Sequence, residues 1–166
     1  MKREQARAIG LFFLLGLMEE RVALSAAARA IAQLKADFSE ISRKDREQNL
    51  VPTDAIIKAC HESWKVHRKQ IPRNQPSVPP ETAWKVPANI DLGTWARYQR
   101  DAPDEDVMTL LFSLVLGITD DELSEGFQTS VGTIRYRLGK AVRQLGLVAR
   151  PRKSDEKSVE KSGGRG

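Results

Sequence analysis

Apolar residues recur every three or four positions in the C-terminal third of the chain, which is the period of an amphipathic α-helix. Between positions 130 and 145 the apolar residues of one sector are Val131, Ile134, Leu138, Ala141, Val142 and Leu145. The residues on the other side are Thr133, Tyr136, Arg137, Lys140 and Arg143, and Arg135 brings the number of bases to four, with no acid between 130 and 144. This pattern predicts a helix with a buried apolar stripe and a positive outer surface.

A shorter acidic helix is predicted just before the basic one. Thr119 is a good N-cap residue, and Glu122 follows it at the spacing of a capping box. Asp120 and Asp121 suit the positive end of the helix dipole. Ser130 is predicted to cap the basic helix, because its hydroxyl can accept a free backbone N–H of the first turn. These parts predict a helix-turn-helix, whose second helix enters the major groove of DNA.

The segment 104–145, 42 of the 166 residues, resembles the region-four helix-turn-helix of bacterial RNA polymerase sigma factors, most closely the extracytoplasmic-function group. The matching runs are 117–119, 122–125, 130–135 and 137–138, followed by 140–141 and Arg143. Gln128 and Thr129 replace the Gly and aliphatic residue usual in the turn, and Gly126 stands where a core aliphatic is common, with Phe127 as the residue that fills the space. The end of the helix, 144–146, also resembles the helix-turn-helix of response regulators, so the partner stays open.

Duplex DNA is the predicted partner of this helix-turn-helix. Basic groups would supply most of the affinity through phosphates, and polar groups at base edges would supply sequence choice. The predicted DNA-binding residues are Thr133, Arg135, Tyr136, Arg137, Lys140 and Arg143.

Two further helices are predicted at the N-terminus, one over the apolar run 9–18 and one from Glu20 with apolar residues at helical spacing up to Phe38. Joined near 16–20, they would form a helical hairpin, and the run weakly resembles the start of sigma region two. The alternative is a signal peptide, because Met1-Lys2-Arg3 precedes the apolar run. Glu4 and the charged residues 19–21 argue against export, and the run is too short to span a bilayer. We therefore predict a cytoplasmic protein with no membrane partner.

A helix is also predicted over 55–67, with Cys60 and Trp64 in the core. Cys60, His61, Glu62 and His67 match no structural zinc spacing, so no metal site is predicted. Six prolines lie between Arg68 and Pro103, and the apolar residues there show no sustained helical or strand period. Segment 69–103 is therefore predicted to be a Pro-rich connector. Trp84, Trp95 and Tyr98 indicate that parts of it are held against the chain's own helices or, as the alternative, against a partner. Asp104 is then predicted to cap an apolar support helix over 105–116.

Composition and charge agree with this interpretation. The chain has 40% hydrophobic and 30% charged residues and a formal net charge of +5, which favours an anionic partner. The single cysteine excludes an internal disulfide framework. No catalytic constellation and no phosphate-binding loop stand out, so neither an enzyme nor a cofactor is predicted.

The sequence thus predicts an all-α chain with four parts: an N-terminal helical region (1–68), a Pro-rich connector (69–103), a helix-turn-helix (104–149) and a disordered basic tail (150–166). The predicted function is that of a DNA-binding transcription regulator, a divergent sigma factor or sigma-like protein, for which the resemblance implies RNA polymerase core and an anti-sigma-like protein as further partners. The alternative is a sigma-like protein-interaction module without promoter activity. It is favoured by the changed turn, the aromatic residues of the connector, and Ser25 to Ala30, where the family carries acids.

Overall fold

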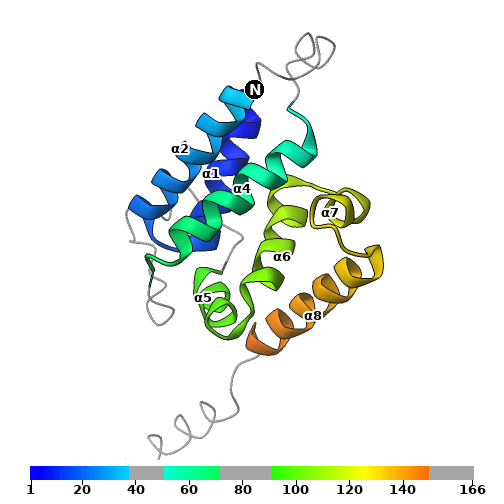
Figure 1. Ribbon diagram of the computed structural model, residues 1–166. Helices are drawn as coiled ribbons and strands as arrows, with labels where there is room; N and C mark the ends of the chain where they lie inside the picture. The colour runs from blue at the N-terminus through cyan, green and yellow to red at the C-terminus, as the bar shows by residue number, and fades with distance from the viewer. Residues whose placement is uncertain (38–50, 72–90, 150–166) are drawn as a thin grey trace, which may run out of the picture.

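The computed structural model describes residues 1–37, 51–71 and 91–149, and within these ranges all regular structure is α-helical (Figure 1). The helices are α1 (Arg3–Leu17), α2 (Glu20–Asp37), α4 (Thr53–Arg68), α5 (Leu92–Asp101), α6 (Asp104–Leu116), α7 (Asp120–Gly126) and α8 (Val131–Ala149). The all-α prediction is confirmed for this part of the chain. The predicted tail 150–166 and Trp84 lie outside the described residues.

The two N-terminal helices lie side by side in opposite directions (Figure 1). Met18 ends α1 in the left-handed conformation, with φ of 54°, and its N–H donates to the carbonyl of Leu14 at 3.0 Å. The Glu19 carboxylate then accepts the N–H of Val22 at 2.6 Å and so satisfies a donor in the first turn of α2. The predicted junction at 16–20 is confirmed.

Helices from both ends of the chain contribute to one hydrophobic core. Phe12 of α1 lies against Phe112 of α6, with ring centroids 4.7 Å apart, and against Trp64 of α4 at 5.8 Å. All three side chains are buried. The boundaries proposed at 68 and 103 stay a prediction, but the helices on either side of them pack directly on one another.

Part of the predicted connector is a helix. Asp91 caps α5 by accepting the N–H groups of Gly93 and Thr94 at 2.9 and 3.2 Å. Trp95 and Tyr98 are buried, and the indole N–H of Trp95 donates to the carbonyl of Leu15 at 2.7 Å. The prediction of a connector is wrong for 92–101, which is helical. A ten-residue helix with few apolar positions is too short to show a sustained period in the sequence. The prediction that Trp95 and Tyr98 pack on the chain's own helices is confirmed.

The start of α6 also differs from the prediction. Pro103 occupies the N-cap position, and Asp104 is the first residue of the helix rather than its cap. The Asp104 carboxylate instead forms an ion pair of 3.2 Å with the guanidinium of Arg68, the last residue of α4. This contact ties the start of α6 to the end of α4.

Cys60 and Trp64 lie in the core as predicted. Burial raises the pKa of the Cys60 thiol to about 12. Among the described residues no group of three or more His, Cys, Asp or Glu side chains could hold a metal ion. None of the described helices is long and apolar enough to cross a membrane.

The buried thiol leads to a chemical prediction. At pH 8 we expect iodoacetamide to alkylate Cys60 in the folded protein roughly two to three orders of magnitude more slowly than in urea, because only the thiolate reacts and burial suppresses it. Mass spectrometry of the alkylated protein over time measures both rates. Equal rates in the two conditions would show that Cys60 is accessible in the native state.

Candidate nucleic-acid interface

The capping box predicted for the short acidic helix is present at the start of α7. The backbone N–H of Thr119 donates to the Glu122 carboxylate at 2.9 Å, and the N–H of Glu122 donates to the Thr119 hydroxyl at 3.3 Å. The hydroxyl of Thr53, at the start of α4, also donates to Glu122 at 2.9 Å. These hydrogen bonds, chiefly those from Thr119, hold the pKa of Glu122 below its usual range. The same carboxylate therefore caps α7 and fastens it to α4.

The turn between α7 and α8 shows how the chain accommodates the unusual residues at 128 and 129. Gln128 takes the left-handed conformation, with φ of 51°, that glycine adopts more easily. Ser124 stabilises the turn, because its carbonyl accepts the N–H of Thr129 at 3.0 Å and its hydroxyl donates to the carbonyl of Thr129 at 2.9 Å. The chain thus closes the turn with side-chain and backbone hydrogen bonds and without a glycine at 128 or 129.

Gly126 is explained by the close approach of α4. A Cβ atom at this position would lie 2.6 Å from Cδ1 of Ile57. The neighbouring Phe127 supplies the apolar packing instead, with its ring centroid 5.5 Å from that of Phe112 and 5.8 Å from that of His61. The prediction that Phe127 fills the space beside Gly126 is wrong, because the side chain of Ile57 occupies it.

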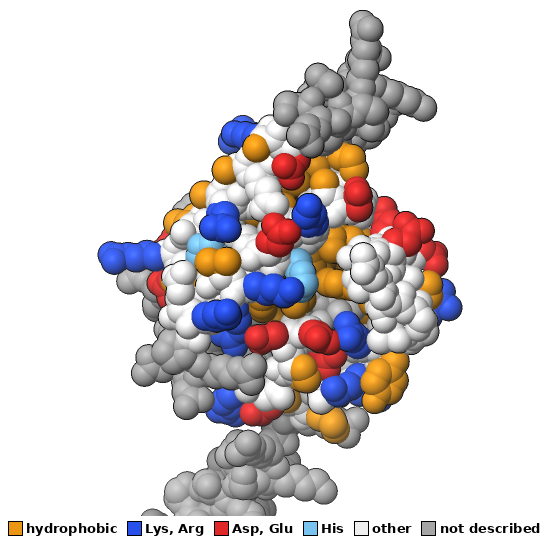
Figure 2. All heavy atoms as spheres, viewed as in Figure 1, with side chains coloured by type: hydrophobic (Ala, Val, Ile, Leu, Met, Phe, Trp, Pro, Cys, Tyr) orange, Lys and Arg blue, Asp and Glu red, His pale blue; other side chains and the backbone are white. Residues whose placement is uncertain are grey.

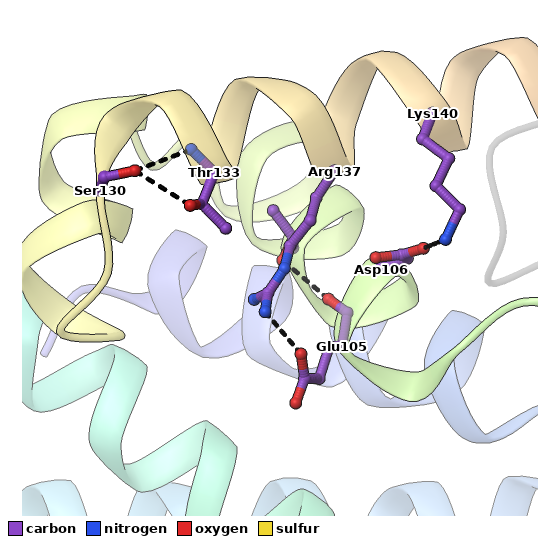
Figure 3. A network of polar contacts seen from close by, with 7 residues as sticks. Glu105, Asp106, Ser130, Thr133, Arg137 and Lys140 are labelled. Carbon is purple, nitrogen blue, oxygen red and sulfur yellow. Dashed lines mark hydrogen bonds and ion pairs between the residues drawn. The ribbon is translucent and has the colours of Figure 1, made fainter.

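The N-terminus of α8 is capped as predicted. The backbone N–H of Thr133 donates to the Ser130 hydroxyl at 3.0 Å (Figure 3). The hydroxyls of Ser130 and Thr133 are also hydrogen-bonded to each other at 2.9 Å. Thr133, one of the predicted DNA-binding residues, is therefore held at the start of the helix.

Two of the predicted DNA-binding bases turn toward α6. Arg137 pairs with Glu105 at 2.5 Å and Lys140 with Asp106 at 2.7 Å, and their side chains are only 24% and 33% exposed (Figure 3). The predicted outward orientation is wrong for these two residues. Arg137 lies only about 60° around the helix from Ile134, the centre of the buried stripe, so acids on α6 can reach it.

Asp106 is the buried acid in the contact between α6 and α8. Its side chain is 7% exposed, and its hydrogen bond to Lys140 is the main cause of the raised pKa of that ammonium group. Burial, and secondarily the charge of Asp106, raise the pKa of Tyr98 to about 12. We did not expect Glu105 and Asp106 to contact α8. The only signal for this contact in the sequence is the run of three acids, 104–106, at the start of a largely apolar helix.

The outer face of α8 carries the remaining predicted site residues. Arg135 and Arg143 are exposed, and Tyr136 is 65% exposed. Arg135 forms an ion pair of 3.1 Å with Asp120 of α7 at the surface. Tyr136 and Arg143 lie on the side of α8 opposite the buried Ile134, whereas Arg135 lies on the flank of the helix next to α7.

The C-terminal half of α8 exposes more apolar side chains than predicted. Val142, predicted to be part of the buried stripe, is 60% exposed, and Leu147 is 65% exposed. Val142 lies about 80° around the helix from Ile134, at the edge of the stripe, where α6 does not cover it. On the face seen in Figure 2, basic and acidic side chains alternate rather than forming one positive surface.

Comparisons with protein-family models, with curated protein sequences and with solved structures find no match to this chain.

Proposed function

We propose that this protein is a DNA-binding transcription regulator, in which α7, the turn and α8 form a helix-turn-helix and α8 lies in the major groove. The observation that supports the proposal is the outer face of α8. The helix is capped at Ser130 and buries Ile134 and Ala141, and near its N-terminal end it exposes Arg135 on the flank beside α7 and Tyr136 on the side opposite Ile134. A recognition helix contacts base edges with residues near its N-terminus.

The resemblance of 104–145 to sigma region four extends the proposal to a sigma factor or sigma-like protein that directs RNA polymerase to promoters. Arg135 and Tyr136 are the residues we assign to base edges or nearby phosphates, and Arg143, two turns further on, to a phosphate. Arg137 and Lys140 are paired with acids on α6, so a phosphate would compete with those acids for them. Thr133, in the first turn of α8 and hydrogen-bonded to the cap Ser130, is assigned to a base or phosphate near that end of the helix.

A salt series tests the DNA-binding proposal. Replacing Arg135 and Arg143 by Ala should lower the affinity for a fluorescently labelled duplex and flatten the plot of log affinity against log salt by about two units, since each lost phosphate contact removes about 0.9. The matched control is Arg21→Ala with Arg29→Ala, which also removes two charges from exposed positions but on α2, a helix that packs on α1 and α4. Fluorescence anisotropy at several salt concentrations measures both slopes. The proposal fails if the two double variants have the same slope.

The sigma-factor part of the proposal has its own test. Purified protein mixed with bacterial core RNA polymerase should start transcription from fragments of its own genome, and the Arg135→Ala, Arg143→Ala variant should reduce the transcripts. Duplex binding without initiation would leave a DNA-binding regulator and remove the sigma-factor assignment.

A protein-interaction module is the second candidate function. It is favoured by the exposure of two large apolar side chains in the C-terminal half of α8, Val142 and Leu147, because a docking helix presents apolar anchors to its partner. Association with core RNA polymerase should then change little with salt. Replacing both residues by Asp should abolish it, while the Arg135→Ala, Arg143→Ala variant keeps it.

A further inference from the structure

The acids of the helix-turn-helix segment compete with any phosphate that α8 would bind. Residues 104–149 contain seven acids and four bases, although the whole chain has a net charge of +5. Three of the four bases, Arg135, Arg137 and Lys140, already pair with acids of α6 or α7. A base that moves to a phosphate must either give up its ion pair or bring the carboxylate next to the phosphate, where like charges repel.

The two pairs with α6 differ in how easily they exchange. The Asp106 side chain is 7% exposed, so the departure of Lys140 would leave a buried carboxylate unpaired, which is strongly unfavourable. The Glu105 side chain is 67% exposed, so water can hydrate its carboxylate when Arg137 leaves. The pair of Lys140 is therefore part of the fold, whereas the pair of Arg137 is exchangeable.

We infer that Glu105 is a specificity-determining residue, which lowers the affinity of α8 for phosphates by holding Arg137. This inference rests on the proposed DNA-binding function. Non-specific binding depends almost entirely on phosphate contacts, whereas specific binding also uses base edges. Glu105 competes with phosphates for Arg137 but leaves Arg135 and Tyr136 exposed for base edges. It therefore lowers the affinity for non-specific DNA by a larger factor than the affinity for a specific site.

The inference is tested by a variant that should bind duplex DNA more tightly than the wild type. Glu105→Gln removes the charge and keeps the size of the side chain, so Arg137 becomes free to bind a phosphate. For a labelled duplex of arbitrary sequence, we expect the salt slope to steepen by about one unit and the affinity at low salt to rise about two- to fivefold. The matched control is Glu125→Gln, which removes the same charge from an exposed position on α7. Among the described residues no ion pair involves Glu125.

A double variant identifies the base that gains the phosphate. Adding Arg137→Ala to Glu105→Gln should cancel the steeper slope, because the released guanidinium is then missing. A rise of the same size in Glu105→Gln and Glu125→Gln would overturn the inference, since net charge alone would account for it. A slope that stays steep in the double variant would also overturn it, because another group would then make the new contact.

The failure of this inference can be told apart from the failure of the proposed function. If Arg135→Ala with Arg143→Ala flattens the salt slope but Glu105→Gln changes nothing, the DNA-binding function holds and the role of Glu105 is rejected. If neither the wild type nor Glu105→Gln binds the duplex, both are rejected. Urea denaturation of each variant checks that the fold is intact.

Discussion

Replacing Gly16 by Ala is expected to destabilise the protein by about 1–3 kcal/mol, the cost of forcing extra atoms into a well-packed core. A Cβ atom at this position would lie 2.1 Å from one atom of the Trp64 ring and 2.8 Å from another. The ring cannot easily move away, because Trp64 is buried and its centroid lies 5.8 Å from that of Phe12. Gly16 therefore allows α1 and α4 to cross at close range.

Gly10, in the same helix, provides the matched control. Outside the backbone of its own helix and its chain neighbours, a Cβ atom there would meet no atom within 4 Å, so Gly10→Ala should raise the free energy of unfolding by about 0.5–1 kcal/mol through helix propensity alone. Urea denaturation followed by circular dichroism measures both values. If Gly16→Ala stabilises the protein as Gly10→Ala does, the close contact with Trp64 does not exist in solution.

Replacing Trp95 by Ala should cost about 3–5 kcal/mol of unfolding free energy, as is usual when a large buried aromatic side chain is removed. Trp95 is buried beside Tyr98, with ring centroids 5.4 Å apart, and its N–H donates to the carbonyl of Leu15. Gln99 donates to the same carbonyl at 2.8 Å and to that of Gly16 at 2.9 Å. Together these side chains of α5 satisfy carbonyl groups at the end of α1 that have no partner within the helix.

Trp95→Phe separates packing from hydrogen bonding. The phenyl ring keeps much of the buried area but has no donor, and the Leu15 carbonyl still accepts from Gln99, so the expected loss is only about 1 kcal/mol. Denaturation of the two variants, with the wild type, measures the difference. If Trp95→Ala left the stability of the isolated protein unchanged, Trp95 would belong to a surface for a partner instead of the core.

The sequence predicted those helix ends that are fixed by hydrogen bonds between residues a few positions apart. The capping box at Thr119, the cap at Ser130 and the junction at 16–20 were predicted because each depends on neighbours in the same turn. The buried positions of α8 were likewise found at Ile134 and Ala141, where the helical period points directly at α6.

The sequence by itself therefore determined that the chain is α-helical, where α2, α7 and α8 begin, and which residue types α8 carries. The tertiary structure decided the rest, because the deciding contacts join residues far apart in the chain. Helix α5 depends on carbonyl groups of α1 about 80 residues earlier, and the direction of Arg137 depends on Glu105, 32 residues earlier. The helical period of a sequence predicts which side of a helix is apolar. Only the packing of helices decides which polar side chains beside the apolar stripe pair with an acid and which remain in water.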